Sequence, residues 1–435
     1  MKMSVTVSFP YPGINPVTIP EKNLLGIFSP EDRPVRNSQG TLIRKAFAEP
    51  IGAVPLAQMA KGKKKILVVV DDLTRMTPVE AILPCLLDEL GAGRKNSPEI
   101  FFMIALGTHQ PMNEEEIARK VGREVASRYP VLNHAWWDPA QLDYLGETDS
   151  GIPIYVNRLA READLIIGIG HIVPHRVTGF SGGGNIIQPG ICGELTTGKT
   201  HWLAAQFTGR EILGKIENPV KKEIEKIAHQ AGLVWIANCI LDGSGKLVDV
   251  VAGDPQRAYR AGAAKSYTIF RSLLPREADI VLVDSYPYDQ ELWLASKGIY
   301  AAELAVRQGG VVILVSPCPA GVSSSHPEVL AKGYHSYATV EEWVSRGEIT
   351  KLTVAAHLVH VGRVIKERAQ GILVSPGISK GETDQLGMIY GASPQEALDT
   401  ALALLGDEAK VAVLKRGGEI LPVINGESNK YGMKG

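Results

Sequence analysis

Three continuous apolar runs, each followed at once by polar residues, constrain the fold of this chain more than any other feature. Runs without polar alternation are typical of parallel strands that are buried on both faces of a sheet. Because the carboxyl ends of parallel strands meet at one edge of the sheet, where α/β folds bind ligands, the polar residues are expected to gather there. The runs cover residues 64–70, 99–106 and 163–169, and the polar stretches begin at Asp71, Gly107 and His171.

Alternation of such strands with helical sequence predicts an α/β fold of two α/β domains with mostly parallel sheets. A chain of 435 residues is long for a single core, which supports division into domains. The first domain is predicted to span residues 1–273 and the second residues 274–409, with Lys297 contributed by the second. The tail, about 410–435, is expected to pack back on the first domain.

Finer elements follow from periodicity and from turn residues. An opening strand is predicted at 4–9, because apolar and polar residues alternate there, and polar sequence follows to about Pro34. A hairpin is predicted from 233–241 and 247–251. The second domain is expected to begin with a strand at 278–284, then a helix over 292–308 and a strand at 311–316.

Composition excludes several classes of protein. A net charge near −1 argues against a nucleic-acid binder, and no run of 18 apolar residues is present to cross a membrane. The first residues lack the features of a secretory signal. The four cysteines are scattered without a C-x-x-C pair, which excludes a cysteine-based zinc site and fits a cytoplasmic protein. Cys192 is read as a small buried hydrophobe.

Histidines and glycines concentrate in the third polar stretch, which contains His171, His175 and His201 and a glycine run over 179–190. Such a mixture suits proton transfer, metal ligation or the close approach of an anion. The competing interpretation is a glycine-rich loop with incidental histidines. His171 and His175 are four residues apart, a zinc spacing, but Pro174 intervenes and no glutamate follows. The remaining histidines are read as structural or surface residues: His134, His229, His326, His335, His357 and His360.

A formal phosphate-loop pattern is present at Gly193–Thr200, with Asp284 as a possible partner aspartate. That motif requires a buried strand directly before its first glycine. Gln188-Pro189-Gly190 stands in that place, and proline is poorly tolerated in a central strand. A phosphate-loop NTPase is therefore the least favoured alternative.

Two cations complete the candidate site. Arg75 follows Asp72 and Thr74 at the end of the first buried strand, where an arginine suits recognition of a carboxylate or phosphate. A surface ion pair is the alternative. Lys297, on its own, reads as a solvated charge.

Together these motifs resemble the nickel-dependent lactate racemase family, in the same order and over most of the chain. The matching residues are Asp72-x-Thr74-Arg75, Ala105-Leu-Gly-Thr-His109-x-Pro-Met112, Gly151-x-Pro153, Asn157, His171-x-x-Pro174-His175-x-x-x-Gly179-Phe-Ser181-Gly182-Gly183, Pro189-Gly190, His201 and Lys297-Gly298.

The resemblance implies two α/β domains with an active-site cleft between them. It also implies a racemase or epimerase of a 2-hydroxy acid that uses a nickel pincer nucleotide, a pyridinium-3,5-bisthiocarboxylic acid mononucleotide with nickel. By motif position His201 would bind nickel, and His109 and His175 would transfer protons. Arg75 and Lys297 would hold the substrate. The residues expected to face the cofactor are Asp72, Thr74, Ser181, Gly182, Gly183 and Asn185. A hydride would pass from C2 to the cofactor and back through a 2-keto acid, with the two histidines as an exchangeable acid–base pair.

The sequence departs from this family at two places. Asn185 stands where a lysine often tethers the cofactor covalently, so we hypothesise noncovalent binding. Trp293 and Leu294 replace a smaller aromatic and a polar residue, which favours a substrate other than lactate. A homologue of the same fold that binds without the cofactor is the second interpretation. The expected partners are the 2-hydroxy acid, the cofactor-biosynthesis enzymes and a second copy of the chain in a homodimer.

Overall fold

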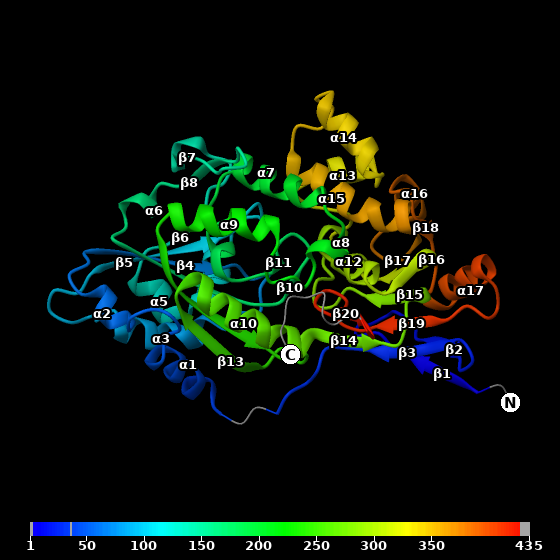
Figure 1. The fold of residues 1–435 in the computed structure, drawn as a ribbon, viewed down its shortest axis with the longest axis horizontal. Helices are drawn as coiled ribbons and strands as arrows, with labels where there is room; N and C mark the ends of the chain where they lie inside the picture. The colour runs from blue at the N-terminus through cyan, green and yellow to red at the C-terminus, as the bar shows by residue number, and fades with distance from the viewer. Residues whose placement is uncertain (1–2, 35–36, 427–435) are drawn as a thin grey trace.

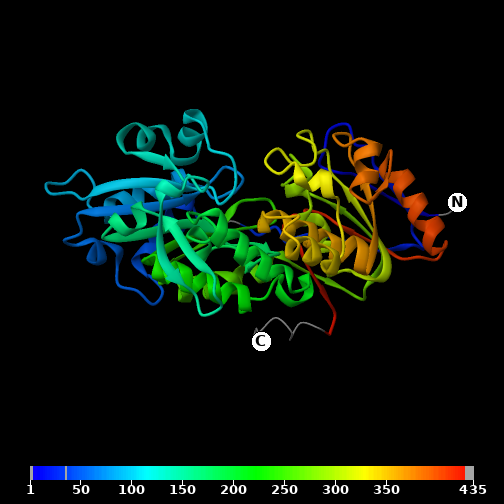
Figure 2. The ribbon, with the colours of Figure 1, turned by 90° about the horizontal axis from the view of Figure 1, so that it is seen from above.

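The computed structural model describes residues 3–34 and 37–426 and folds into two lobes, each built around a six-stranded sheet. Figure 2 shows the lobes side by side: one runs from blue through cyan to green, and the other combines the dark blue start of the chain with its yellow, orange and red parts. No helix among these residues has the length and apolar character needed to cross a membrane.

The sheet of the first lobe has the order β13-β12-β9-β4-β5-β6. Its strands are parallel except for β13, which forms the predicted antiparallel hairpin with β12. The three apolar runs of the sequence are neighbours at its centre, so their polar ends meet at one edge as predicted. Its strands are β4 (Lys65–Asp71), β5 (Glu99–Ala105), β6 (Val131–Asn133), β9 (Leu165–His171), β12 (Leu233–Leu241) and β13 (Leu247–Gly253).

Both faces of this sheet are covered. Alternate residues of β4 point to opposite sides, so Val68 and Val70 join one apolar cluster while Leu67 and Val69 join another. Helices α1 (Gln39–Ala48), α2 (Leu56–Ala60) and α3 (Val79–Glu89) supply the first cluster, and α9 (Pro219–Gln230) and α10 (Pro255–Phe270) supply the second. Burial on both faces explains why these strands read as unbroken apolar runs.

The second lobe holds an all-parallel sheet with the order β18-β17-β16-β15-β19-β3. Its strands are β3 (Leu24–Phe28), β15 (Ala278–Asp284), β16 (Val306–Val315), β17 (Ala369–Val374), β18 (Ile389–Tyr390) and β19 (Val411–Leu414). Its helices are α11 (Leu292–Ala295), α12 (Lys297–Glu303), α13 (Glu328–Lys332), α14 (Tyr337–Ser345), α15 (Leu352–Gly362), α16 (Lys380–Gln385) and α17 (Pro394–Leu405).

The start of the chain corrects the predicted domain boundary. β3 pairs with β19, and residues of the hairpin formed by β1 (Ser4–Val7) and β2 (Val17–Pro20) pack into the same apolar cluster as Ile280. Residues 3–28 therefore belong to the second lobe rather than to a domain spanning 1–273. The polar stretch expected up to Pro34 contains two of these strands.

The end of the chain differs from the prediction in a similar way. β19, expected in a tail that returns to the first domain, is a strand of the second sheet. Beyond it, β20 (Leu421–Ile424) pairs with β14 (Arg271–Leu274), where the chain passes from the first lobe to the second. Residues 427–435 of the predicted tail lie outside the described residues. The helix predicted over 292–308 ends at Glu303, because Val306 already pairs with Ala278 in the sheet.

The first lobe also contains shorter helices and strands. They are α4 (Glu114–Val121), α5 (Arg123–Arg128), the hairpin β7 (Leu142–Glu147) and β8 (Pro153–Asn157), α6 (Leu159–Glu162), β10 (Pro174–His175), β11 (Gly179–Phe180), α7 (Glu194–Ala205) and α8 (Gly209–Ile212). α4 begins with a capping box between Asn113 and Glu116. α7 packs against α15 of the second lobe and so joins the two halves of the molecule.

Candidate active site

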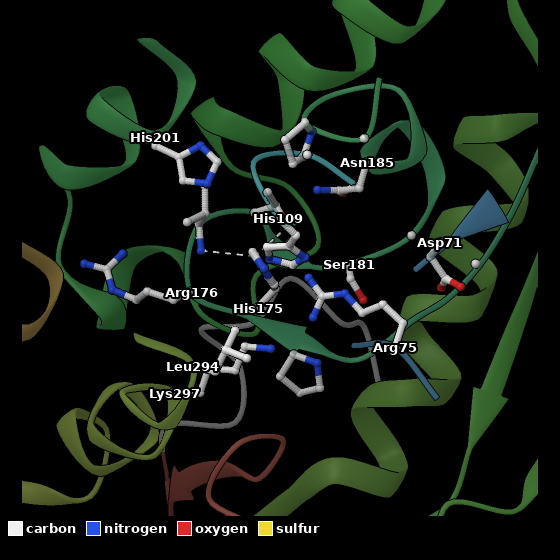
Figure 3. A pocket seen from close by; sticks show the side chains of 18 of the residues that line it. Asp71, Arg75, His109, His175, Arg176, Ser181, Asn185, His201, Leu294 and Lys297 are labelled. Carbon is white, nitrogen blue, oxygen red and sulfur yellow. Dashed lines mark hydrogen bonds between the residues drawn. The ribbon is translucent and has the colours of Figure 1, made fainter. Parts of the chain in front are cut away.

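A cavity of about 210 Å³ lies between the lobes, at the carboxyl edge of the first sheet. The first lobe contributes the loops after β4, β5 and β9 together with α7. The second contributes α11, α12, α15 and residues 417–420. Figure 3 shows side chains from both lobes converging on this space. Nine of the eleven predicted site residues line it; Thr74 and Gly183 do not.

His109 is held by Asp72. Its Nδ1 lies 2.6 Å from Asp72 Oδ2, and because an ionised carboxylate only accepts hydrogen bonds, Nδ1 is the donor. The Nε2 of the neutral ring is then free to take a proton. The backbone N–H and the hydroxyl of Thr74 donate to the other oxygen, Asp72 Oδ1, at 3.0 and 2.6 Å. Thr74, predicted to face the cofactor, therefore lies behind Asp72 and orients it.

Electrostatics keep the Asp72 carboxylate charged. Burial alone would raise its pKa, but the charge and hydrogen bond of His109, together with the charge of Arg75, hold that pKa well below its ordinary value. A permanent negative charge beside His109 stabilises the imidazolium that forms when its Nε2 accepts a proton. The pair thus has the arrangement of a general base and its positioning carboxylate.

Lys120, which sequence reasoning missed, clamps the loop that carries Asp72 and Arg75. Its ammonium lies 2.7 Å from Asp71 Oδ1 and donates to the backbone carbonyls of Asp72 and Arg75 at 2.7 and 3.1 Å. The lysine is 4% exposed. His171 Nδ1 lies 2.9 Å from the Thr77 hydroxyl, which donates to Asp71. His171 thus supports the loop.

His175 faces the same cavity, but its ring has a different environment. Nδ1 accepts the backbone N–H of Val177 at 3.3 Å and lies 3.4 Å from the Thr178 hydroxyl. That hydroxyl donates to the carbonyl of Phe180, so its lone pairs remain available to a protonated Nδ1. Both tautomers of His175 therefore have a partner. Burial, followed by the charges of Arg75 and Lys297, holds its pKa well below the ordinary value.

His201, on the second turn of α7, is oriented as a metal ligand would be. Nδ1 donates to the carbonyl of Thr197 at 2.8 Å, which fixes the tautomer and leaves Nε2 as a lone-pair donor. Burial lowers the pKa of His201 and so favours the neutral ring that ligation requires. Among the described residues, no group of three or more His, Cys, Asp or Glu side chains gathers as a metal site. The other ligands of a metal bound to His201 would have to come from a bound cofactor or other small molecule.

The Ser181–Gly183 segment, predicted to face the cofactor, forms several hydrogen bonds to other parts of the protein. The Ser181 hydroxyl donates to the carbonyl of His171 and accepts the N–H of Val173. The N–H of Gly183 donates to Asn238 Oδ1 at 2.8 Å. The Ser181 hydroxyl and the Gly183 N–H therefore already have acceptors within the protein, and neither is free to donate to a phosphate. Ser181 and Gly182 still line the cavity.

Asn185 lies on the cavity wall beside a lysine that no sequence motif marks. Lys221, on α9, donates to Asn185 Oδ1 at 2.7 Å and to the carbonyl of Gly182 at 2.8 Å. Its ammonium lies 3.6 Å from the centre of the Tyr259 ring. Burial lowers the pKa of Lys221 to about 7. Asn185 stands where family members often carry a lysine, and the amine of Lys221 lies next to its side chain.

Arg75 and Lys297 meet across the cavity from opposite lobes. The Lys297 ammonium lies 3.2 Å from the centre of the Tyr288 ring. Burial, and then the charge of Arg75, holds the pKa of Lys297 well below its ordinary value. Two cations that disfavour each other in this way are stabilised by an anion placed between them.

Two histidines of the second lobe were assigned wrongly from the sequence. His357 and His360, read as structural or surface residues, both line the cavity from α15. His357 stacks on Trp293 at 4.0 Å between ring centres and lies within hydrogen-bonding distance of two tyrosine hydroxyls. Nothing in their local sequence marked them, because only the packing of α15 against α7 brings them to the site.

The phosphate-loop alternative is wrong. Gly193 caps α7, and residues 194–200 form its first two turns rather than a loop. No strand directly precedes Gly193. The Lys199 side chain is exposed rather than directed at a nucleotide. Asp284 ends β15 in the second lobe and accepts N–H groups of Tyr286 and Gly417.

Comparison with known proteins covers both lobes. Residues 13–211 match the family model of the lactate racemase N-terminal domain, and residues 274–421 match that of the C-terminal domain. A lactate racemase of Thermoanaerobacterium thermosaccharolyticum is 31% identical over 308 residues, 70% of this chain and 72% of that protein. One of Lactiplantibacillus plantarum is 29% identical over 393 residues, 87% of this chain and 90% of that protein.

The fold agrees as well. The lactate racemase apoprotein from T. thermosaccharolyticum superimposes with a TM-score of 0.85 at 26% identity, over 97% of this chain and all of that one. A Thermotoga maritima protein shares the fold at a TM-score of 0.72 and 23% identity, over 91% of this chain. The lobes and their shared cavity define a two-domain α/β protein whose site suits proton transfer on a small anion. Matches in both lobes specify it further: the chain belongs to the lactate racemase family.

Proposed function

We propose that the protein is a racemase or epimerase of a 2-hydroxy acid. The observation that carries this proposal is the pair of histidines, His109 and His175, which stand on separate loops and face one cavity with two cations. A single base would serve a dehydrogenase. Two bases suit a reaction in which the substrate oxygen lies near one imidazole before inversion at C2 and near the other after it.

The residues present fit a nickel pincer nucleotide. His201 offers one oriented nitrogen, and the described residues supply no other cluster of ligands, as expected when the remaining ligands belong to the cofactor. When bound, this group would accept hydride from C2 and return it. Asn185 cannot form the amide-type bond that a lysine forms, so binding is proposed to be noncovalent, through His201, the Ser181–Gly182 wall and the loop that carries Asp72.

The protein's own groups then act on the substrate. Arg75 and Lys297 bind the carboxylate and fix the position of C2. His109 Nε2 takes the hydroxyl proton of one enantiomer, and Asp72 stabilises the resulting imidazolium. His175 does the same for the other enantiomer in the tautomer whose Nδ1–H points to Thr178.

The test uses protein produced together with the cofactor-biosynthesis enzymes and supplied with single-enantiomer 2-hydroxy acids. Appearance of the opposite configuration at C2, followed by chiral chromatography, supports the proposal. Nickel-loaded protein that inverts none of a panel of lactate, malate, phenyllactate, 2-hydroxybutyrate and sugar acids refutes it. Turnover of lactate equal to or better than that of the others would refute the narrower proposal of a different substrate.

Asn185 favours one alternative, a homologue that binds without the cofactor. Nickel content after co-production separates the two: one nickel per chain supports the enzyme, and none supports the binding protein. Intact-mass measurement after denaturation tests noncovalent attachment. A retained adduct would overturn it, and peptide mapping to Lys221, 2.7 Å from Asn185, would identify the amine responsible.

A further inference from the structure

A second polar pair lines the cavity and has no part in the proposed chemistry. Arg176 directly follows His175 in the first lobe, and His360 lies near the end of α15 in the second. They are 4% and 3% exposed. Figure 3 shows Arg176 on the same side of the site as His201 and Lys297, across His175 from Arg75.

The hydrogen-bonding capacity of this pair is largely unused. Arg176 Nη2 donates to the carbonyl of Phe207 at 2.7 Å, but its Nε and Nη1 have no hydrogen-bond partner among the described residues. Neither ring nitrogen of His360 has one either. Leaving a buried polar group unpaired is costly, and more so for a charged one. Four such atoms on two residues that line one cavity indicate a ligand that pairs with them.

The nearest carboxylate does not fill this role. Glu303 Oε2 lies 4.0 Å from Arg176 Nε, beyond hydrogen-bonding distance. Both oxygens of Glu303 already accept the backbone N–H of Gly209, at 2.9 and 3.1 Å. Burial lowers the pKa of Arg176 in spite of this neighbour, so the counter-charge within the protein does not compensate for the buried guanidinium.

The charges around the cavity point the same way. Each carboxylate that lines it has a cationic or imidazole partner: Asp71 with Lys120 at 2.7 Å, Asp72 with His109 at 2.6 Å, and Glu419 with Arg416 at 2.6 Å. In contrast, Arg75 and Lys297 form no ion pair within 4.0 Å in the described part of the chain, and Arg176 has only the distant Glu303. Three cations facing one space suit a ligand with more than one negative charge.

We propose that Arg176 and His360 form a second anion subsite, which binds the distal carboxylate of a 2-hydroxydicarboxylic acid while Arg75 and Lys297 hold the carboxylate next to the reacting carbon. This inference deepens the proposed function and rests on it for the identity of the reacting end. The guanidinium offers Nε–H and Nη1–H, and the His360 ring offers one N–H. Adjacency to His175 places the subsite next to the acid–base residue rather than at a remote surface.

The experiment measures binding to the cofactor-free protein by calorimetry, so it does not depend on turnover. The probes are L-malate and L-2-hydroxybutyrate, which differ only in a terminal carboxylate or methyl group. We expect the wild type to prefer malate by roughly 10- to 100-fold, the size of one or two charge-assisted hydrogen bonds. Arg176→Gln should reduce this preference to about one, and Arg176→Lys should restore part of it.

Matched variants and a third probe test whether the preference for malate comes from Arg176 itself. Arg75→Gln should weaken both acids, and circular dichroism with thermal melting checks that each variant folds. Equal binding of the two acids by the wild type, binding of neither, or an unchanged preference in Arg176→Gln overturns the inference. Inorganic phosphate that binds through Arg176 and is not displaced by malate assigns the pair to a phosphate group instead, which also overturns it.

Failure of this inference can be told apart from failure of the proposed function. If cofactor-loaded protein inverts 2-hydroxybutyrate as readily as malate, the proposed racemase function stands and the proposed subsite is refuted. If the protein binds malate through Arg176 yet inverts nothing when loaded with nickel, the subsite stands and the racemase function is refuted.

Discussion

Replacement of Asp72 by asparagine should disable His109 without disturbing the fold. Asparagine has the same shape, but one of its two polar atoms becomes a donor. Thr74 decides which one, because its N–H and hydroxyl both donate to Oδ1. The amide oxygen must therefore occupy the Oδ1 position, and the amide nitrogen must face His109 Nδ1, which is 2.6 Å from the present Oδ2.

An amide nitrogen in that position donates to Nδ1 and drives the proton of the neutral ring to Nε2. His109 then offers an N–H where the substrate needs a base. General base catalysis contributes on the order of 10²–10⁴-fold, so kcat for inversion should fall by about that factor in Asp72→Asn. Substrate affinity should change little, because Arg75 and Lys297 remain in place.

The assay follows inversion of each enantiomer by chiral chromatography with cofactor-loaded protein, and the nickel content is matched between variants. For a racemase kcat/KM must fall equally in both directions, since the two enantiomers have the same free energy. Nitrogen NMR of protein labelled in histidine reports the tautomer of His109 directly. A loss of less than about tenfold, or a His109 tautomer that is unchanged in Asp72→Asn, would show that the carboxylate does not set the base.

Three further predictions concern other positions. His201→Ala should lose nickel on desalting while its circular dichroism stays unchanged; nickel retained at one atom per chain would remove His201 as the ligand. Gly179→Ala should destabilise the fold by more than about 1 kcal/mol in urea titrations, because Gly179 has φ +78° and a Cβ there would clash with the Lys215 carbonyl oxygen; an unchanged midpoint would contradict this. Lys221 has a pKa lowered by burial to about 7, so between pH 7 and about 10 the unfolded chain binds more protons and stability should rise with pH. Lys221→Met should lack that component of the rise, and identical pH profiles would argue against a buried, neutralised amine.

The sequence predicted the first sheet well and the chain ends poorly. The reason is that only some strands have a local residue pattern that identifies them. Strands β4, β5 and β9 are buried on both faces, so their residues are apolar without interruption and can be recognised in isolation. β3 is an edge strand whose five residues are all partly exposed or exposed, and nothing in so short a segment shows that its partner is β19. Its membership of the second lobe depends on pairing across nearly the whole chain.

The candidate site divides in the same way. His109, His175 and Arg75 stand at the ends of recognisable strands, so their convergence followed from topology. Lys120 and His360 lie on helices, and their sequence neighbours do not show that Lys120 is buried against the loop after β4 or that His360 lines the cavity. Lysine and histidine at such positions are ordinarily read as surface residues. Only the packing of the folded chain shows which of these side chains are buried.

The pairing of β3 with β19 sets an order of events during synthesis. The chain emerges from the ribosome amino end first, and domains generally fold as they appear. β3 emerges early but must wait for the strand at 411–414, whereas every strand of the first sheet is complete once residue 253 has been made. The first lobe can therefore fold on the ribosome while β3 remains unpaired. Any truncation that removes β19 should leave β3 without its partner, open to aggregation or to capture by a chaperone.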